Sequence, residues 1–277
     1  MTNPTVQDVW NSTPAWGFPF VGSAVAPTPA AATLVDGGLA QQVAGLSSYV
    51  FWNDAVYGEV GAYRWAPQGA PALPDPTVAG VVDGVAPYWR VAFTRSFGDN
   101  YLEVGTYGMS ARRQPGTFGS GAPTDRFTDI ALDAQYQRPF GNNSLTITGT
   151  WIHESRSLAA SVDSGFASVA SQSLNTFRAR ATDHVGQAYA FSVGPFVTTG
   201  TADPALYAPG AVGGSATGSP NSSGAVAEVD WNPWMNARIT LQYTAYTKFN
   251  GASSNYDGSG RSASDNNTLY AVLWLMF

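Results

Sequence analysis

The chain ends on Asn266-Asn267-Thr268-Leu269-Tyr270-Ala271-Val272-Leu273-Trp274-Leu275-Met276-Phe277. This stretch is apolar and aromatic. The tail of a soluble domain is commonly frayed, and a frayed tail has no reason to be apolar. The closing strand of a transmembrane β-barrel faces lipid and carries aromatic residues at the membrane boundary. The stretch therefore predicts the last strand of such a barrel, with Trp274 and Phe277 as girdle residues and as the carboxy-terminal signal read by the barrel-assembly machinery.

The composition fits a surface that partly meets lipid. Of the 277 residues, 44% are apolar and only 12% are charged, against about 25% charged in an average soluble domain. The formal net charge of −6, with 13 Lys and Arg scattered along the chain, excludes the concentrated basic surface of a nucleic-acid partner. The chain contains no cysteine, which excludes disulfides, thiolate zinc sites and Cys-x-x-Cys-His haem attachment. We expect no cofactor.

Strand-like runs with a two-residue period cover most of the chain. In 238–249, for example, Ile239, Leu241 and Tyr243 share one face and Arg238, Thr240 and Gln242 share the other. This alternation is typical of a strand with one apolar and one wet face. The eleven predicted runs are 45–53, 55–66, 87–97, 100–111, 126–138, 144–155, 175–184, 187–198, 224–231, 236–249 and 267–277.

The connections between these runs alternate strictly between short and long. The short ones are 53–54, 97–100, 139–143, 185–186 and 232–235, and the long ones are 67–86, 112–125, 156–174, 199–223 and 250–266. Outer-membrane barrels have short periplasmic turns and long outer loops, while a β-sandwich has no reason to alternate in this way. The sequence therefore predicts an all-β fold, an antiparallel up-and-down transmembrane β-barrel of 11–12 strands over 43–277, in the outer membrane of a Gram-negative bacterium.

The first 42 residues predict an irregular N-terminal segment, with an outer loop at 21–42. A single-chain bacterial barrel usually has an even number of strands, so a further strand is expected before residue 21. Val6 to Trp16 could form it, although Pro14 makes this a weak strand. The other interpretation, which we favour, is that the chain is the carboxy-terminal part of a larger barrel and lacks its N-terminal portion.

The alternation also predicts which charged side chains face the lumen. These candidates are Arg90, Glu103, Asp129, Asp133, Arg178, Arg180, Glu228, Asp230, Arg238 and Lys248. Facing rows of acids and bases would set a transverse field and bias ion passage. Alternatively, the same charges pair with one another and fill the lumen, and both interpretations remain open at this stage.

No catalytic or metal-binding pattern stands out. His153 and His184 are the only two histidines, and neither lies in a recognisable Ser/His/Asp spacing. The loop from Asn255 to Asp265 lacks the alternating acids and closing Glu of an EF-hand. Trp231 and Trp234 flank a short turn, which is typical of the periplasmic aromatic girdle. We therefore expect no enzymatic activity, no catalytic residue and no metal site.

Several segments of the carboxy-terminal part carry a family resemblance: Asn236-Ala237-Arg238, Leu241-Gln242-Tyr243-Thr244-Ala245-Tyr246, Lys248-Phe249-Asn250-Gly251, Asn255-Tyr256-Asp257-Gly258 and Ser264-Asp265-Asn266-Asn267-Thr268-Leu269-Tyr270. On these segments the chain resembles proteobacterial outer-membrane barrel proteins labelled cytochrome c-like, from genes that neighbour multihaem cytochromes. The resemblance implies a barrel that insulates a periplasmic multihaem cytochrome for electron transfer across the outer membrane. It also implies a longer N-terminal part.

The residues and the resemblance together predict an outer-membrane barrel in contact with lipid. It would act as a porin-like passive channel or as a sleeve around a partner such as the cytochrome. An outer-membrane enzyme and a structural or adhesive barrel are the remaining alternatives.

Overall fold

The computed structural model describes residues 25–39, 43–66, 80–116, 119 and 121–275. The predicted weak strand at 6–16 and the terminal Met276 and Phe277 lie outside the described residues. Among the residues that are described, no helix is both long enough and apolar enough to span a membrane.

Over the residues that the structure describes, twelve strands form one antiparallel sheet. They are β1 (Val43–Trp52), β2 (Val56–Trp65), β3 (Val82–Asp83), β4 (Ala86–Phe97), β5 (Asn100–Arg113), β6 (Asp125–Phe140), β7 (Asn143–Ser157), β8 (Ser171–Val185), β9 (Tyr189–Gly200), β10 (Ser222–Trp234), β11 (Ala237–Lys248) and β12 (Thr268–Leu275). Apart from the two-residue β3, which pairs with the end of β5, each strand pairs with the next one along the chain. The all-β, up-and-down fold is confirmed, and every predicted run corresponds to one of these strands.

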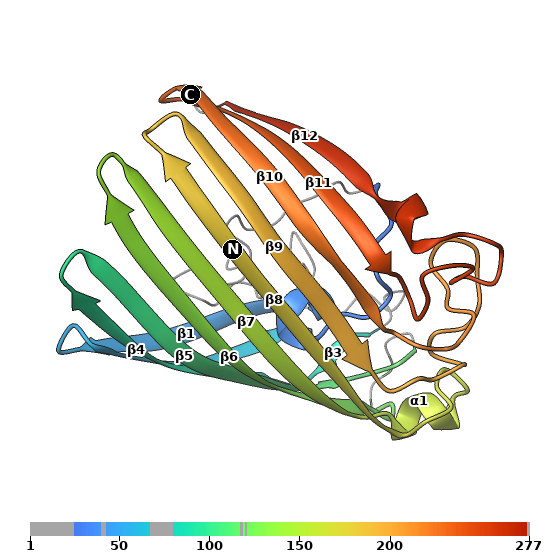
Figure 1. Cartoon of the computed structure of the whole chain (residues 1–277). Helices are drawn as coiled ribbons and strands as arrows, with labels where there is room; N and C mark the ends of the chain where they lie inside the picture. The colour runs from blue at the N-terminus through green and yellow to red at the C-terminus, as the bar shows by residue number, and fades with distance from the viewer. Residues whose placement is uncertain (1–24, 40–42, 67–79, 117–118, 120, 276–277) are drawn as a thin grey trace.

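Short turns join the strands at one end of the sheet, and long loops join them at the other (Figure 1). Asn53 and Asp54, between β1 and β2, have φ angles of 53° and 50°. Positive φ at both central residues is the geometry of a type I′ hairpin turn, whose twist matches the flanking strands. Gly98, Gly141 and Gly186 supply positive φ at three of the other turns.

The sheet curls along its length (Figure 1). β1 and β12 are its two edges, and they are not paired with each other in the described part of the chain. Because successive strands on this path are antiparallel, the first and the eleventh run in the same direction, toward the end with the short turns.

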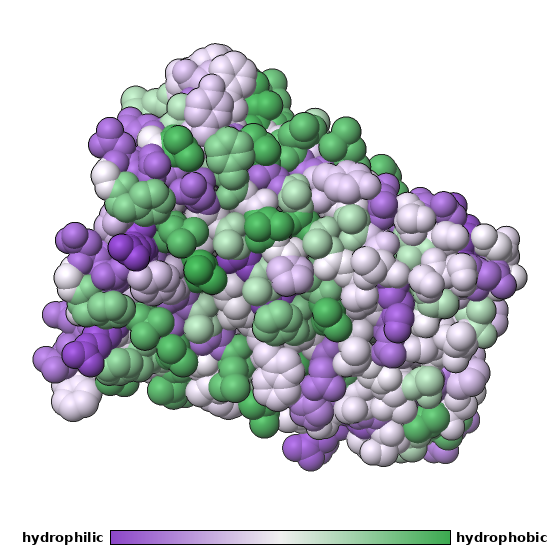
Figure 2. Space-filling model, viewed as in Figure 1, coloured by the Kyte–Doolittle hydropathy of each residue, from purple (hydrophilic) through white to green (hydrophobic). Residues whose placement is uncertain are grey.

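The outer face of the sheet is apolar in its middle and charged only near the strand ends. Figure 2 shows hydrophobic side chains gathered over the strands, with paler and more hydrophilic residues toward both ends. Outward-facing, exposed hydrophobic residues include Leu46, Val60, Val91, Phe93, Val104, Ile130, Leu132, Phe177, Val193, Val229, Leu241 and Leu273. Arg95 and Arg138 lie near the turns, and Arg64, Arg112 and Arg126 lie near the loops. This arrangement is that of an apolar belt with polar margins.

The opposite, inner face carries a short π-helix, η1 (Leu34–Gly38), which lies within the curve of the sheet (Figure 1). Leu34, Val35 and Leu39 join a buried cluster with Tyr63 and Tyr107 on the strands. Residues 25–39 belong to the segment expected to be irregular or an outer loop, and the structure places η1 of this segment against β5 and β6. Two further short helices, α1 (Ala159–Asp163) and η2 (Ala263–Asn266), lie in the long loops.

Candidate functional site

The inner face gathers nearly all of the predicted lumenal charges. By strand register and burial, it holds Arg90, Glu103, Asp129, Asp133, Arg178, Arg180, Glu228, Asp230 and Arg238. Lys248 differs, because a register shift precedes it and leaves it opposite Ser223 at the loop end, where it is exposed. Beyond such a shift, the two-residue alternation no longer predicts which face a side chain is on.

Arg90, Glu103 and Asp133, here called the buried triad, cross β4, β5 and β6. The Arg90 guanidinium donates to both carboxylate oxygens of Asp133, at 3.0 and 2.6 Å, and to Glu103 Oε1 at 2.8 Å. Two aligned donors to one carboxylate make this a strong, directional ion pair. Gly105 makes room for it, since a Cβ there would lie 2.7 Å from Asp133 Oδ1 and 2.8 Å from Arg90 Nη2.

A second group of charges fixes η1 to the sheet. Glu154 Oε2 accepts the Leu34 N–H at 2.8 Å, and Asp129 Oδ2 accepts the Val35 N–H at 3.0 Å. Arg156 pairs with Glu154 and also donates to the Ala32 carbonyl at 3.1 Å. Two carboxylates on strands β6 and β7 therefore satisfy backbone donors that the short helix leaves without intrahelical partners.

Glu154 and Arg156 were missing from the predicted lumenal set. The same two-residue alternation that placed Asp129 inward also places Thr150, Ile152, Glu154 and Arg156 on one face of β7. The inward orientation of Glu154 and Arg156 could therefore have been predicted from the sequence, although their partners in and beside η1 could not.

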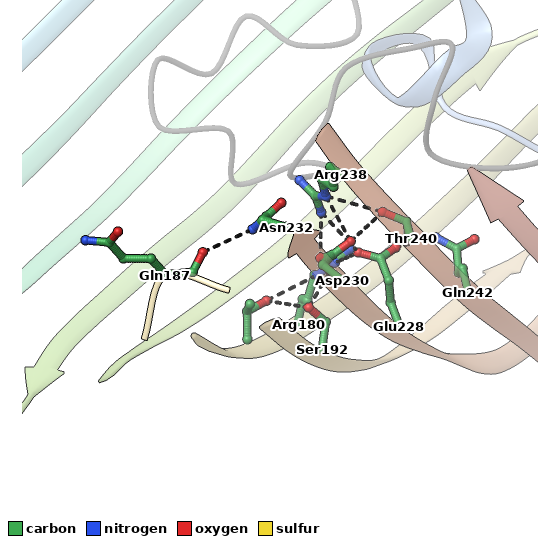
Figure 3. A network of polar contacts seen from close by, with 10 residues as sticks. Arg180, Gln187, Ser192, Glu228, Asp230, Asn232, Arg238, Thr240 and Gln242 are labelled. Carbon is green, nitrogen blue, oxygen red and sulfur yellow. Dashed lines mark hydrogen bonds and ion pairs between the residues drawn. The ribbon is translucent and has the colours of Figure 1, made fainter. Parts of the chain in front are cut away.

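The third group lies on β8 to β11 and is drawn in Figure 3. Arg180 pairs with Glu228 and donates to Ser192 Oγ at 3.0 Å. Arg238 pairs with Asp230 at 2.6 Å and lies 3.8 Å from Glu228 Oε1. Glu228 thus lies between two arginines from different strands.

Gln242 and Thr240 complete this network. Gln242 Nε2 donates to the second oxygen of Glu228 at 2.7 Å, and the Thr240 hydroxyl donates to Asp230 (Figure 3). Both carboxylates are therefore held from two sides, by an arginine and by a neutral side chain of β11.

Arg178 joins β8 to the helix inside the curve. It forms an ion pair with Asp36 of η1, and the two residues are 142 positions apart in the chain. Together with the contacts of Asp129 and Glu154, this pair ties η1 to three neighbouring strands, β6, β7 and β8.

The predicted aromatic residues divide between the two faces. Trp231 and Trp234 are exposed, and Trp231 shares the outer face of β10 with Val229. Trp274 is opposite Arg238 in the register of β11 and β12 and so lies on the inner face, away from the outward-facing Trp231. Phe277 lies outside the described residues.

Neither histidine belongs to the ion pairs of the inner face described above. His153 lies on the outer face of β7, where it stacks on Trp151 and shares a 2.9 Å hydrogen bond with Asn175. His184 is exposed at the turn end of β8. Within the described ranges, no group of three or more His, Cys, Asp or Glu residues could hold a metal ion.

The long loops are held together by buried carboxylates. Asp203 accepts backbone hydrogen bonds from Ser168, Val169 and Leu206, which joins the loop after β9 to the loop before β8. Burial would raise the pKa of Asp203, but these hydrogen bonds and that of the Ser168 hydroxyl outweigh it and hold the pKa below its usual value. The loop end of the sheet is consequently a structured rim.

No family model and no curated protein matches the chain. Among solved structures, the chain is similar to the NanC porin, with a TM-score of 0.38 and 9% identity over 85% of this chain and 93% of that chain. A likeness at this level carries no argument about what the chain does.

Proposed function

We propose that the chain forms a porin-like β-barrel of the bacterial outer membrane and acts as a passive channel for small solutes. One observation carries the proposal: the described strands present an uncharged, largely apolar middle on one face and paired charges on the other. Lipid outside and water inside require this division. A soluble sheet of the same size would bury its apolar face.

The position of the outward-facing arginines supports the same proposal. Arg64, Arg112 and Arg126 lie near one end of the strands, and Arg95 and Arg138 lie near the other. A charged side chain at the membrane centre is costly, whereas one near the boundary reaches the headgroups with its long stem. The edges β1 and β12 would have to be paired in lipid, because unpaired backbone groups there are unfavourable.

A sleeve around a multihaem cytochrome is less well supported by the inner face. A sleeve must leave its interior free for the partner, and here the chain's own η1 and its buried cluster with the strands already occupy part of that space. A channel needs only a path wide enough for a small hydrated solute.

Reconstitution tests the proposal directly. The full chain should fold in detergent, show a heat-dependent shift in gel migration, and produce discrete conductance steps in a planar lipid bilayer when it is added alone. A folded protein that inserts but conducts nothing would overturn the channel and favour a sleeve. A monodisperse, folded protein in buffer without detergent would overturn the membrane location itself.

A further inference from the structure

The ion pairs of β8 to β11 are asymmetric in their exposure to water. The side chains of Arg178, Arg180 and Arg238 are 41%, 25% and 21% exposed, whereas their partners Asp36, Glu228 and Asp230 are 10%, 7% and 4% exposed. Each carboxylate therefore lies beneath its guanidinium, and the accessible part of each pair is positive. We call Arg178, Arg180 and Arg238 the arginine row.

The remaining acids of the inner face do not balance this positive surface. Glu103 and Asp133 are fully covered in the buried triad, and Glu59, Asp129 and Glu154 are also buried. Among the described residues, the accessible charges of the inner-face ion pairs are therefore guanidinium groups. The formal net charge of the whole chain, −6, does not describe this part of the surface.

The arginine row is held in position by its surroundings. Glu228 bridges Arg180 and Arg238, Gln242 holds Glu228 from the other side, and Ser192 accepts a hydrogen bond from Arg180 (Figure 3). Arg178 lies two residues from Arg180 on β8, on the same face. A planar guanidinium fixed in this way suits the binding of carboxylate and phosphate oxygens.

From these observations we propose that the arginine row is an anion-selecting site, which favours small solutes bearing a carboxylate or phosphate group over cations. The inference rests on the proposed channel function and adds the class of solute to it. Arg178 contributes most, because its side chain is the most exposed of the three.

The test is the reversal potential of the full chain in a planar bilayer under a tenfold gradient of dilute KCl, where screening is weak. The wild-type channel should prefer chloride. A unit charge about 4 Å from an ion in water changes the local concentration of that ion about fivefold, and it does so in opposite senses for chloride and potassium. Arg178→Gln should therefore lower the chloride-to-potassium permeability ratio by about fivefold or more. Arg178→Lys should retain most of the preference, since it keeps the charge.

Arg112→Gln is the matched control. It removes the same charge from the exposed outer face at the loop end of β5, and it should leave the ratio unchanged. Inorganic phosphate added to one side should also reduce chloride current in the wild type more than in Arg178→Gln.

The outcomes separate this inference from the proposed channel. A channel that conducts without chloride preference, or whose preference survives Arg178→Gln or falls equally with Arg112→Gln, overturns the anion site and leaves the channel standing. Absence of any conductance from the folded wild type overturns both.

Discussion

The buried triad and the arginine row both pair arginine with acids on the inner face, but water reaches them very differently. Arg90 has no exposed side-chain surface, and its two acidic partners are likewise covered. Arg180 and Arg238 keep part of their surface accessible, and the neutral Gln242 shares the task of holding Glu228. The same type of ion pair therefore serves two purposes. The buried triad packs and fixes the wall formed by β4, β5 and β6, whereas the arginine row keeps positive charge accessible to solvent on the wall formed by β8 to β11.

The strongest test of this difference is the same substitution on each wall. Arg90→Met should destabilise the folded protein by about 3–5 kcal/mol, because it leaves Glu103 and Asp133 buried without their cation. Arg180→Met should cost about 1 kcal/mol, since that pair is partly exposed and Glu228 keeps Gln242 and the nearby Arg238. Urea unfolding in detergent micelles, followed by tryptophan fluorescence, gives both values. Equal losses would contradict the distinction between the walls.

Neighbouring residues on β11 test which face of that wall meets lipid. Leu241 is exposed on the outer face, and Gln242 is buried on the inner face beside Glu228. Leu241→Arg places a charge on lipid near mid-membrane depth and should cost about 2–4 kcal/mol. Gln242→Arg brings a cation to a carboxylate and should be tolerated. The measurement is the fraction of chain that folds into lipid vesicles, and similar losses from both variants would refute the assignment of faces.

A glycine tests how tightly the triad is packed. Gly105→Ala would bring a methyl group within 2.8 Å of Arg90 and Glu103 and should cost about 1–3 kcal/mol through overpacking. Gly149→Ala is the control, because its Cβ would lie 3.8 Å from the Arg178 carbonyl, an ordinary contact. The midpoint of urea unfolding should therefore be lower for Gly105→Ala than for Gly149→Ala. If both variants unfold like the wild type, the triad is less closely packed than the structure implies.

The smallest expected effect lies where the row meets η1. Asp36→Asn removes the ion pair with the half-exposed Arg178 and should cost less than about 1 kcal/mol. This difference from the wild type should shrink as salt is raised, whereas the cost of Arg90→Met should hardly change, because buried pairs are screened much less. Unfolding curves of the wild type and of both variants, measured at low and at high salt, would show this difference in salt dependence.

Much of this fold could be predicted from local pattern. The alternation along β11 fixes its two faces, and the same reasoning placed Arg90, Glu103 and Asp133 inward. Strand pairing could be predicted as well, because each short turn joins neighbours in the sheet. These properties depend on residues close together in sequence.

The rest depends on contacts between distant parts of the chain. The pair of Asp36 with Arg178 and the hydrogen bonds of η1 with Asp129 and Glu154 join segments that no local period relates. Whether the inward charges would form a field or pair with one another could not be chosen from sequence, since it depends on exposure. The bulge that displaces Lys248 was equally hidden, because one extra residue leaves no mark in the apolar pattern.

The shared direction of β1 and β12 has a consequence for how the sheet would close into the proposed barrel. In the described part of the chain, eleven strands follow one another along the sheet and form ten antiparallel pairs. Because eleven is an odd number, a direct pairing of β1 with β12 would be parallel. Its hydrogen bonds would be slanted and slightly weaker per residue than the others. The β1–β12 pair would therefore be the first pair of strands to separate. Antiparallel pairing around the whole barrel would require one more strand between β1 and β12, running in the opposite direction.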